Sequence, residues 1–124
     1  MEKTSILVVD DLRNIRLTLS GILEDRGYNV VTAENGYQAI EAIKEMHFDV
    51  ILMDIKMPGI NGVDTYREVK KIDPKAVVIM MTAYSLEDLV KRAVSEGVYT
   101  CIYKPFEIAK VIVLVEDAIK EVVA

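Results

Sequence analysis

The sequence predicts an α/β fold in which one parallel five-stranded sheet is covered by helices on both faces. Short apolar runs alternate five times with segments of helical periodicity along the 124 residues. Such alternation is typical of repeated β–α units, whose right-handed crossovers place helices on both sides of the sheet. Five units favour the flavodoxin-like three-layer (βα)5 sandwich with strand order 2-1-3-4-5. We expect a single domain over residues 1–124.

The expected strands are short apolar or β-branched runs bounded by turn residues. They are Ile6–Val9, Asn29–Ala33, Asp49–Asp54, Ala76–Met81 and Thr100–Tyr103. The helices follow from apolar residues that recur at spacings of three and four. The first is expected between Asp11 and a stop at Gly27. The others are expected at Tyr37–Met46, Val63–Ile72, Leu86–Glu96 and about Glu107–Val123.

Composition and charge narrow the classes of function. A net charge of −5 argues against direct binding of nucleic acid, which needs a basic face. No run approaches the ~20 apolar residues of a membrane span, and the N-terminal apolar run is too short for a signal peptide. Cys101 is the only cysteine, so no intramolecular disulfide can form. We therefore expect a cytoplasmic protein without a membrane or nucleic-acid partner.

Polar residues stand at the ends of four of the expected strands. Asp10 and Asp11 follow the first strand, Asp54 ends the third, Thr82 follows the fourth and Lys104 follows the fifth. Because the carboxyl ends of parallel strands lie along one edge of a sheet, these side chains should meet there. Adjacent carboxylates repel one another unless a hard cation such as Mg²⁺ lies between them. The cluster therefore predicts a site that binds a divalent cation together with a phosphoryl group.

Each of these residues also has a plainer interpretation. Asp10 and Asp11 could cap the helix that follows them, because aspartate is a good N-cap. Asp54 could be a polar strand terminus, Thr82 an ordinary β-branched strand residue and Lys104 a solvated lysine. Because complementary polar residues occur at four matching strand ends, a shared site is favoured over four unrelated structural roles.

In these residues the chain resembles the response-regulator receiver domain of two-component signalling. The resemblance extends over essentially the whole chain and rests on an ordered set of motifs. These are Asp10-Asp11, Asp54 with Met57-Pro58-Gly59 and Gly62, Thr82-Ala83, and Lys104-Pro105-Phe106. Similarity to the single-domain sporulation phosphorelay regulator is also visible, through segments 81–84 and 104–106. The tetrapeptide at 81–84 is also similar to receivers attached to transcriptional activators, so it does not decide the subtype.

The resemblance implies that Asp54 accepts a phosphoryl group from a histidine kinase or a histidine phosphotransfer protein. It also implies that Asp11 and Asp54 bind Mg²⁺ (or Mn²⁺) directly, with the backbone carbonyl of Lys56 as a third ligand. Asp10 would act on the metal through a bound water. The receiver would assist its own phosphorylation and dephosphorylation and would turn over no separate substrate, so we do not expect an enzyme.

The resemblance assigns further roles around the phosphoryl group. Thr82, the amide of Ala83 and Lys104 would hold the phosphoryl oxygens. Lys56 and Tyr84 match positions that tune self-dephosphorylation, and a long lysine and a bulky tyrosine there predict a long-lived phosphoform.

One position on the fifth strand departs from the family pattern. Cys101 stands where many receivers have an aromatic residue that swings inward during switching. This puts aromatic-swing signalling in doubt, and we expect Cys101 to be a small, partly buried apolar residue. Tyr99 and Tyr103 share its strand parity and could take over part of that surface.

Two surfaces are candidates for partners. On the first helix, Asn14, Ile15 and Thr18 share one face near the acidic cluster, and the resemblance implies that a histidine-bearing helical bundle docks there. The last helix carries one apolar stripe, and Val113 and Leu114 fall outside it and are expected to face solvent. The stripe consists of Ile108, Val111, Ile112, Val115, Ala118, Ile119 and Val122. The exposed apolar residues are either scattered surface residues or part of a homodimer or output interface on the fourth and fifth helices.

Alternative functions remain open from the sequence. A flavin carrier of the same topology needs a phosphate loop where this chain has Asp10 and Asp11, so it is disfavoured. A phosphohydrolase that forms an aspartyl-phosphate intermediate has a second aspartate two positions after its nucleophile, as far as the resemblance to that class goes. This chain has Lys56 at that position, so the phosphohydrolase is also disfavoured. Within signalling, the chain is either a complete regulator or a receiver excised from a DNA-binding transcriptional regulator or hybrid histidine kinase.

Overall fold

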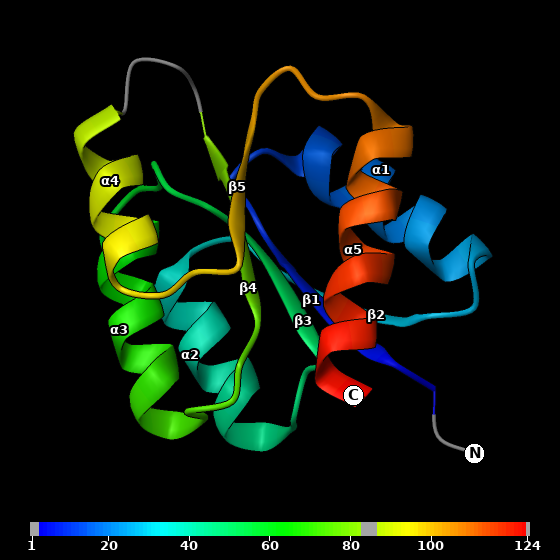
Figure 1. Ribbon diagram of the computed structural model, residues 1–124, viewed down its shortest axis with the longest axis horizontal. Helices are drawn as coiled ribbons and strands as arrows, with labels where there is room; N and C mark the ends of the chain where they lie inside the picture. The colour runs from blue at the N-terminus through cyan, green and yellow to red at the C-terminus, as the bar shows by residue number, and fades with distance from the viewer. Residues whose placement is uncertain (1–2, 83–86, 124) are drawn as a thin grey trace.

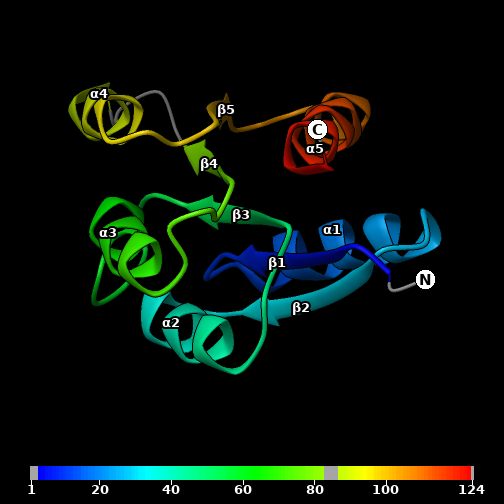
Figure 2. The same ribbon diagram turned by 60° about the horizontal axis from the view of Figure 1, so that its bottom comes forward.

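The five strands form one parallel sheet in the order β2-β1-β3-β4-β5, and Figure 2 shows them in this succession. The computed structural model describes residues 3–82 and 87–123. The strands are β1 (Ser5–Val9), β2 (Asn29–Ala33), β3 (Val50–Asp54), β4 (Val78–Thr82) and β5 (Thr100–Tyr103). The predicted flavodoxin-like strand order is confirmed.

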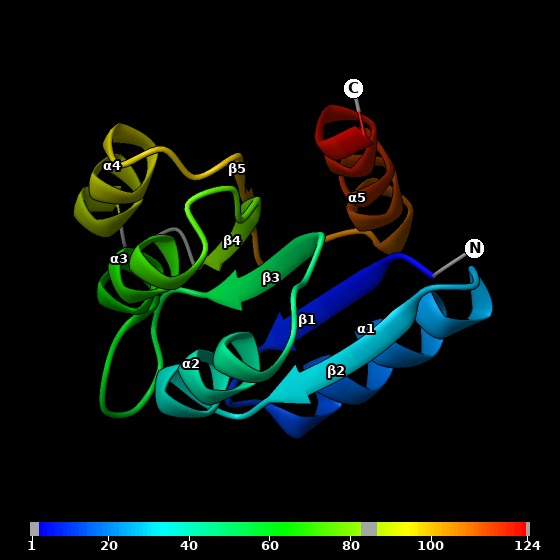
Figure 3. The same cartoon turned by 90° about the horizontal axis from the view of Figure 1, so that it is seen from below.

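Helices cover both faces of this sheet, as the alternation of elements predicts. They are α1 (Arg13–Asp25), α2 (Gly36–Glu45), α3 (Gly62–Ile72), α4 (Glu87–Ser95) and α5 (Ile108–Val123). In Figure 1, α2, α3 and α4 lie on one side of the sheet and α1 and α5 on the other. Figure 3 shows α1 running along β2, with which it is in contact. No helix in the described ranges is long and apolar enough to cross a membrane.

Each face of the sheet has its own buried core because successive side chains of a strand point to opposite faces. Leu7, Met53 and Met80 pack against α2, α3 and α4. Their neighbours Val8, Leu52 and Ile79 pack against α1 and α5. Strands β3 and β4 are buried along their whole length. The carboxyl ends of these strands are therefore held by packing on both sides.

Most element boundaries differ from the predicted ones by one or two residues, and two of the differences have a clear cause. Asn35 and Asn61 act as N-caps, since their side chains accept hydrogen bonds from the backbone N–H of Gln38 and Asp64. Helices α2 and α3 consequently begin one residue earlier than predicted. The predicted start of the fourth helix, Leu86, lies outside the described residues.

The prediction that Leu114 faces solvent is wrong. Leu114 is half-buried and packs against the core formed with α1 and α5, whereas Val113 is 55% exposed as predicted. Leu114 lies three positions after the buried Val111. A spacing of three residues brings two side chains to the same side of a helix. The buried face of α5 therefore runs through Leu114, and Val122 lies outside the residues whose side chains are described.

Gly62 fixes the close approach of α3 to the end of β3. Its N–H donates to the Ile55 carbonyl at 2.7 Å. A Cβ at this position would lie 2.4 Å from the Asp54 carbonyl oxygen and 2.9 Å from the Ile55 Cα. Both contacts are with backbone, which cannot rotate away.

We predict that Gly62→Ala lowers the free energy of unfolding by about 2 kcal/mol, because β3 or α3 must shift to admit the methyl group. Gly21→Ala is the matched control, since a Cβ there meets no atom within 4 Å in helix α1. The control should be more stable than the wild type by up to about 1 kcal/mol. Urea unfolding measures both changes, and equal stabilities would show that the close approach at Gly62 imposes no constraint.

Candidate metal and phosphoryl site

The polar residues at the strand ends meet at one edge of the sheet. Asp10, Asp11 and Asp54 each offer a carboxylate oxygen within 4.8 Å of the other two. The Nζ of Lys104 lies 2.8 Å from Asp10 Oδ2 and 3.5 Å from Asp54 Oδ2. Thr82 is the buried last residue of β4, and its carbonyl accepts a hydrogen bond from the N–H of Lys104 at 2.7 Å. The structure thus brings together residues that are up to 94 positions apart.

The three carboxylates differ in their access to solvent. Asp10 is fully buried and Asp54 is 6% exposed, whereas Asp11 is exposed. Lys104 reaches in from the end of β5 with 20% of its side chain exposed. The site therefore has a buried floor and one open side.

Neither aspartate of the pair caps α1. The N-cap of that helix is Leu12, which makes no side-chain capping bond. Asp10 instead accepts a hydrogen bond from the N–H of Leu12 at 2.9 Å through Oδ1, and from Lys104 through Oδ2. Both carboxylate oxygens of Asp10 are thus engaged in holding the loop and the lysine.

The surroundings of Asp54 make its ionised form costly. Burial raises the pKa of its carboxyl from 3.8 to about 6, Lys104 opposes this rise, and the charges of Asp10 and Asp11 add to it. Loss of hydration and repulsion between like charges both favour the protonated acid. One lysine does not offset three clustered carboxylates.

This donor set fits a hard divalent cation. Mg²⁺ takes oxygen ligands and commonly binds through one or two carboxylates, waters and a phosphate. Asp11 and Asp54 offer carboxylate oxygens beside the open side of the cluster. The carbonyl of Lys56 stays a predicted ligand, and Lys56 itself is exposed. Ala83 and Tyr84, for which the sequence predicts a phosphoryl contact and a tuning role, lie outside the described residues.

Cys101 lies on the sheet face that is covered by α2, α3 and α4. It is half-buried and packs against that core, and burial raises the pKa of its thiol. Tyr99 and Tyr103 are 37% and 38% exposed. Cys101 thus has the surroundings of a small, partly buried apolar residue, and its effect on switching stays a prediction.

Arg16 borders this site and is not among the residues that the sequence predicts for it. Its Nη1 donates to the carbonyl of Asp10 at 2.8 Å, and its Nη2 lies 3.5 Å from Glu34 Oε1. The sequence pattern that indicates Arg16 is a basic residue about one turn into the helix that follows the acidic pair.

A parallel sheet that gathers three carboxylates, a threonine and a lysine at its carboxyl edge defines a phosphoacceptor-type site. The family model of the response regulator receiver domain matches residues 6–116. The chain therefore belongs to the response regulator receiver domain family, and it is a phosphoacceptor receiver of two-component or phosphorelay signalling. Receiver domains bind Mg²⁺ at an acidic site, interact with histidine kinases or phosphotransfer proteins, and act as signalling modules.

Several similar proteins are matched along most of their length. The chain is 39% identical to the chemotaxis protein CheY of Thermotoga maritima over 108 residues, which are 86% of this chain and 90% of that protein. It is 35% identical to sporulation initiation phosphotransferase F of Bacillus subtilis over 121 residues, which are 98% and 94% of the two chains. The beryllofluoride-activated NtrC4 receiver domain dimer is a structural neighbour with a TM-score of 0.88 and 36% identity, covering 95% of this chain and 98% of that one. Longer transcriptional regulators are matched over about a quarter of their length.

We predict that Asp54→Asn stabilises the metal-free protein near pH 7 but not near pH 4. The folded-state pKa of about 6 lies above the ordinary value of 3.8, so the folded protein binds more protons than the unfolded chain between these values. The contribution of Asp54 to stability therefore falls as the pH rises through this window. Asparagine removes the penalty, which should add about 1 to 2 kcal/mol at neutral pH.

Urea unfolding in the presence of a chelator measures this difference. Asp117→Asn is a control, because Asp117 is exposed on α5 and its side chain makes no hydrogen bond or ion pair within the described residues. A gain from Asp54→Asn that is the same at both pH values would contradict the predicted burial of charge.

Proposed function

We propose that residues 1–124 act as one receiver domain and that Asp54 takes the phosphoryl group from a phosphohistidine. A carboxylate oxygen of Asp54 attacks phosphorus, the bond between phosphorus and the imidazole nitrogen breaks, and the electron pair of that bond leaves with the imidazole. The product is an acyl phosphate on Asp54 and a free histidine on the donor. The protein has no separate substrate, so it acts as a switch rather than as an enzyme that turns over.

Each neighbour of Asp54 has a part in this transfer. Mg²⁺, or Mn²⁺ in its place, supplies positive charge to the phosphoryl oxygens when it is bound by Asp11, Asp54 and the Lys56 carbonyl. Asp10 would act on the metal through a bound water, and it holds Lys104 at 2.8 Å. Lys104 neutralises a second part of the phosphoryl charge, which is about −2. Thr82 and the Ala83 amide donate hydrogen bonds to the remaining oxygens.

One observation carries this proposal. Asp54 is almost fully buried, yet its carboxylate lies beside those of Asp10 and Asp11 and 3.5 Å from the Nζ of Lys104. The cluster is open to solvent on the side of Asp11, which is exposed. Phosphoryl transfer is catalysed mainly by positioning and by neutralisation of charge, and this geometry provides both.

We predict that the wild type gains the mass of one phosphoryl group in the presence of Mg²⁺ and a small acyl-phosphate donor. Asp54→Asn should gain none, because an amide is not a nucleophile for this transfer. Lys104→Ala should be phosphorylated at least about tenfold more slowly, since the phosphoryl charge loses its fixed counterion. Intact-protein mass spectrometry over time measures all three rates.

Two controls separate this outcome from the alternatives. Lys44→Ala removes an exposed lysine of α2 and should be phosphorylated at the wild-type rate. Phosphorylation of the Asp54→Asn variant at the same rate as the wild type would contradict the proposed acceptor. Turnover of a phosphate monoester would revive the phosphohydrolase, and a coloured purified protein would revive the flavin carrier.

The roles of Lys56 and Tyr84 in tuning the lifetime of the phosphoform stay predictions. Lys56 is exposed, so it can lie over the entering water, but Tyr84 lies outside the described residues. We propose that phosphorylation biases a two-state equilibrium in the loop after β3 and in the surface of α4. The sequence predicts the same for the segment after β4, residues 83–86, which lies outside the described residues.

The surface that receives the donor includes the start of α1. Asn14 and Thr18 are exposed there, whereas Ile15 is half-buried and packs against the core. We propose that a helical bundle bearing the phosphohistidine contacts Asn14 and Thr18, and that Ile15 mainly supports the helix beneath them.

A second surface, formed by α4, β5 and α5, supports self-association. Val94, Tyr103 and Val113 are each more than a third exposed on these elements, and so is Tyr99, which directly precedes β5. The matched NtrC4 receiver is a dimer in its activated state. We propose that this chain forms a homodimer through α4, β5 and α5 once Asp54 is phosphorylated.

We predict that phosphorylation raises the sedimentation coefficient of the wild type to that of a dimer. Val113→Glu should remain a monomer, because the added charge would have to be buried in the interface. Leu17→Glu is the matched control on α1, which is exposed to a similar extent at 58%. A wild type that stays monomeric at every concentration, before and after phosphorylation, would contradict the dimer.

A further inference from the structure

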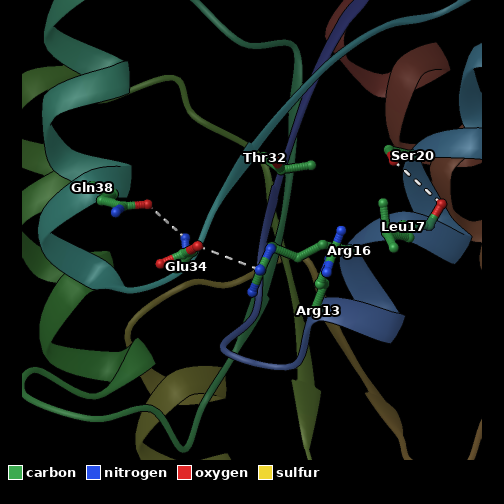
Figure 4. Close-up of a pocket in the computed structure, with 7 residues that line it drawn as sticks. All are labelled: Arg13, Arg16, Leu17, Ser20, Thr32, Glu34 and Gln38. Atoms are coloured by element: carbon green, nitrogen blue, oxygen red, sulfur yellow. Dashed lines mark hydrogen bonds and ion pairs between the residues drawn. The ribbon is translucent and has the colours of Figure 1, made fainter.

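A polar groove of about 310 Å³ lies between α1 and the end of β2, beside the loop that carries the acidic pair. Figure 4 shows Arg16 reaching across this groove toward Glu34, with Arg13 beside it and Gln38 on the far side of Glu34. Arg13 makes no hydrogen bond or ion pair within the described part of the chain, whereas Arg16 makes both. The side chain of Arg16 is only 13% exposed, although it carries a full charge.

Arg16 completes the set of bonds that hold Asp10. The N–H of Asp10 donates to the Ala33 carbonyl at 3.1 Å, and its two carboxylate oxygens accept from Leu12 and Lys104. The remaining polar group is the carbonyl, which accepts from Arg16 Nη1 at 2.8 Å. A hydrogen bond from a charged donor is stronger than one between neutral groups.

The carbonyl of Asp10 belongs to the peptide that joins Asp10 to Asp11. Its direction therefore sets the backbone from which the side chain of Asp11 extends. Asp11 is exposed, and its carboxylate has no hydrogen bond within the described residues, so the backbone alone places it near Asp54. A rotation of this one peptide would move the Asp11 carboxylate away from the cluster.

We propose that Arg16 is a positioning residue for the metal site, which holds the Asp10–Asp11 peptide so that Asp11 faces Asp54. It acts through the backbone and touches neither the cation nor the phosphoryl group. This inference rests on the proposed function, since it concerns the same Mg²⁺ site.

Glu34 holds Arg16 in this position from the other side of the groove. Its Oε1 lies 3.5 Å from Arg16 Nη2, and its own N–H donates to Gln38 Oε1 at 2.8 Å. Glu34 directly follows Ala33, whose carbonyl accepts from the N–H of Asp10. The turn after β2 thus supports the acidic loop twice, once through its backbone and once through Arg16. The planar guanidinium can serve both acceptors at once, which a lysine ammonium does less well.

The test is a calorimetric titration of Mg²⁺ into the phosphate-free wild type and three variants. Arg16→Ala should bind Mg²⁺ about tenfold more weakly, as is usual when a residue that orients a ligand is removed. Arg16→Lys should lie between this variant and the wild type. Arg13→Ala, in the same groove, should bind at least as tightly as the wild type.

The sign of the change separates positioning from simple electrostatics. Both alanine variants remove one positive charge near a cation site, so charge alone would tighten Mg²⁺ binding in both. Positioning predicts weaker binding for Arg16→Ala only. The phosphorylation rate of Arg16→Ala should return to within about twofold of the wild-type rate at saturating Mg²⁺, because Asp54, Thr82 and Lys104 remain in place.

Equal or tighter Mg²⁺ binding by Arg16→Ala would overturn the inference and leave the proposed function intact. Equal weakening in both alanine variants would also overturn it. A wild type that binds no Mg²⁺ would instead overturn the proposed function, and this inference with it. Should Arg16→Ala fail to fold, Arg16→Lys with wild-type affinity would count against the role of the guanidinium.

Discussion

The repulsion among three carboxylates that the fold gathers around a single lysine is the interaction that determines what this site can bind. With Asp10, Asp11 and Asp54 ionised beside Lys104, the cluster carries three negative charges and one positive charge. Two of the carboxylates are withdrawn from water, and the pKa of Asp54 rises to about 6 as a result. A hard cation and a phosphoryl group together restore the balance of charge, so the site is built for a complex rather than for the empty protein.

The rest of the chain keeps these charges close together in spite of their repulsion. Strands β3 and β4 are buried on both faces, so the ends that carry Asp54 and Thr82 are rigid. Gly62 lets α3 pack directly on the Asp54 peptide, and Arg16 ties α1 to the carbonyl of Asp10. Packing energy from the two cores thus supports a local arrangement that is unfavourable in the metal-free protein.

The sequence predicts the arrangement of the sheet well because alternation and strand ends are local patterns. Five apolar runs predict the five strands, and the polar residues at four of the strand ends predict which residues form the site. The missed features depend on contacts between different elements or between an element and a loop. The bond of Arg16 to Asp10 crosses a loop, and the packing of Leu114 depends on how α5 is rotated against the sheet. No periodicity within one segment fixes either contact.

The most direct test of this account is the dependence of stability on Mg²⁺ at neutral pH. Urea unfolding at increasing Mg²⁺ should show a wild-type stability that climbs with the logarithm of concentration, by about 2.7 kcal/mol at 100 times the dissociation constant. Asp11→Asn, which retains the shape of the side chain, should give a nearly flat response. A wild-type stability that does not change with Mg²⁺ would contradict the claim that the carboxylate cluster is completed by a cation.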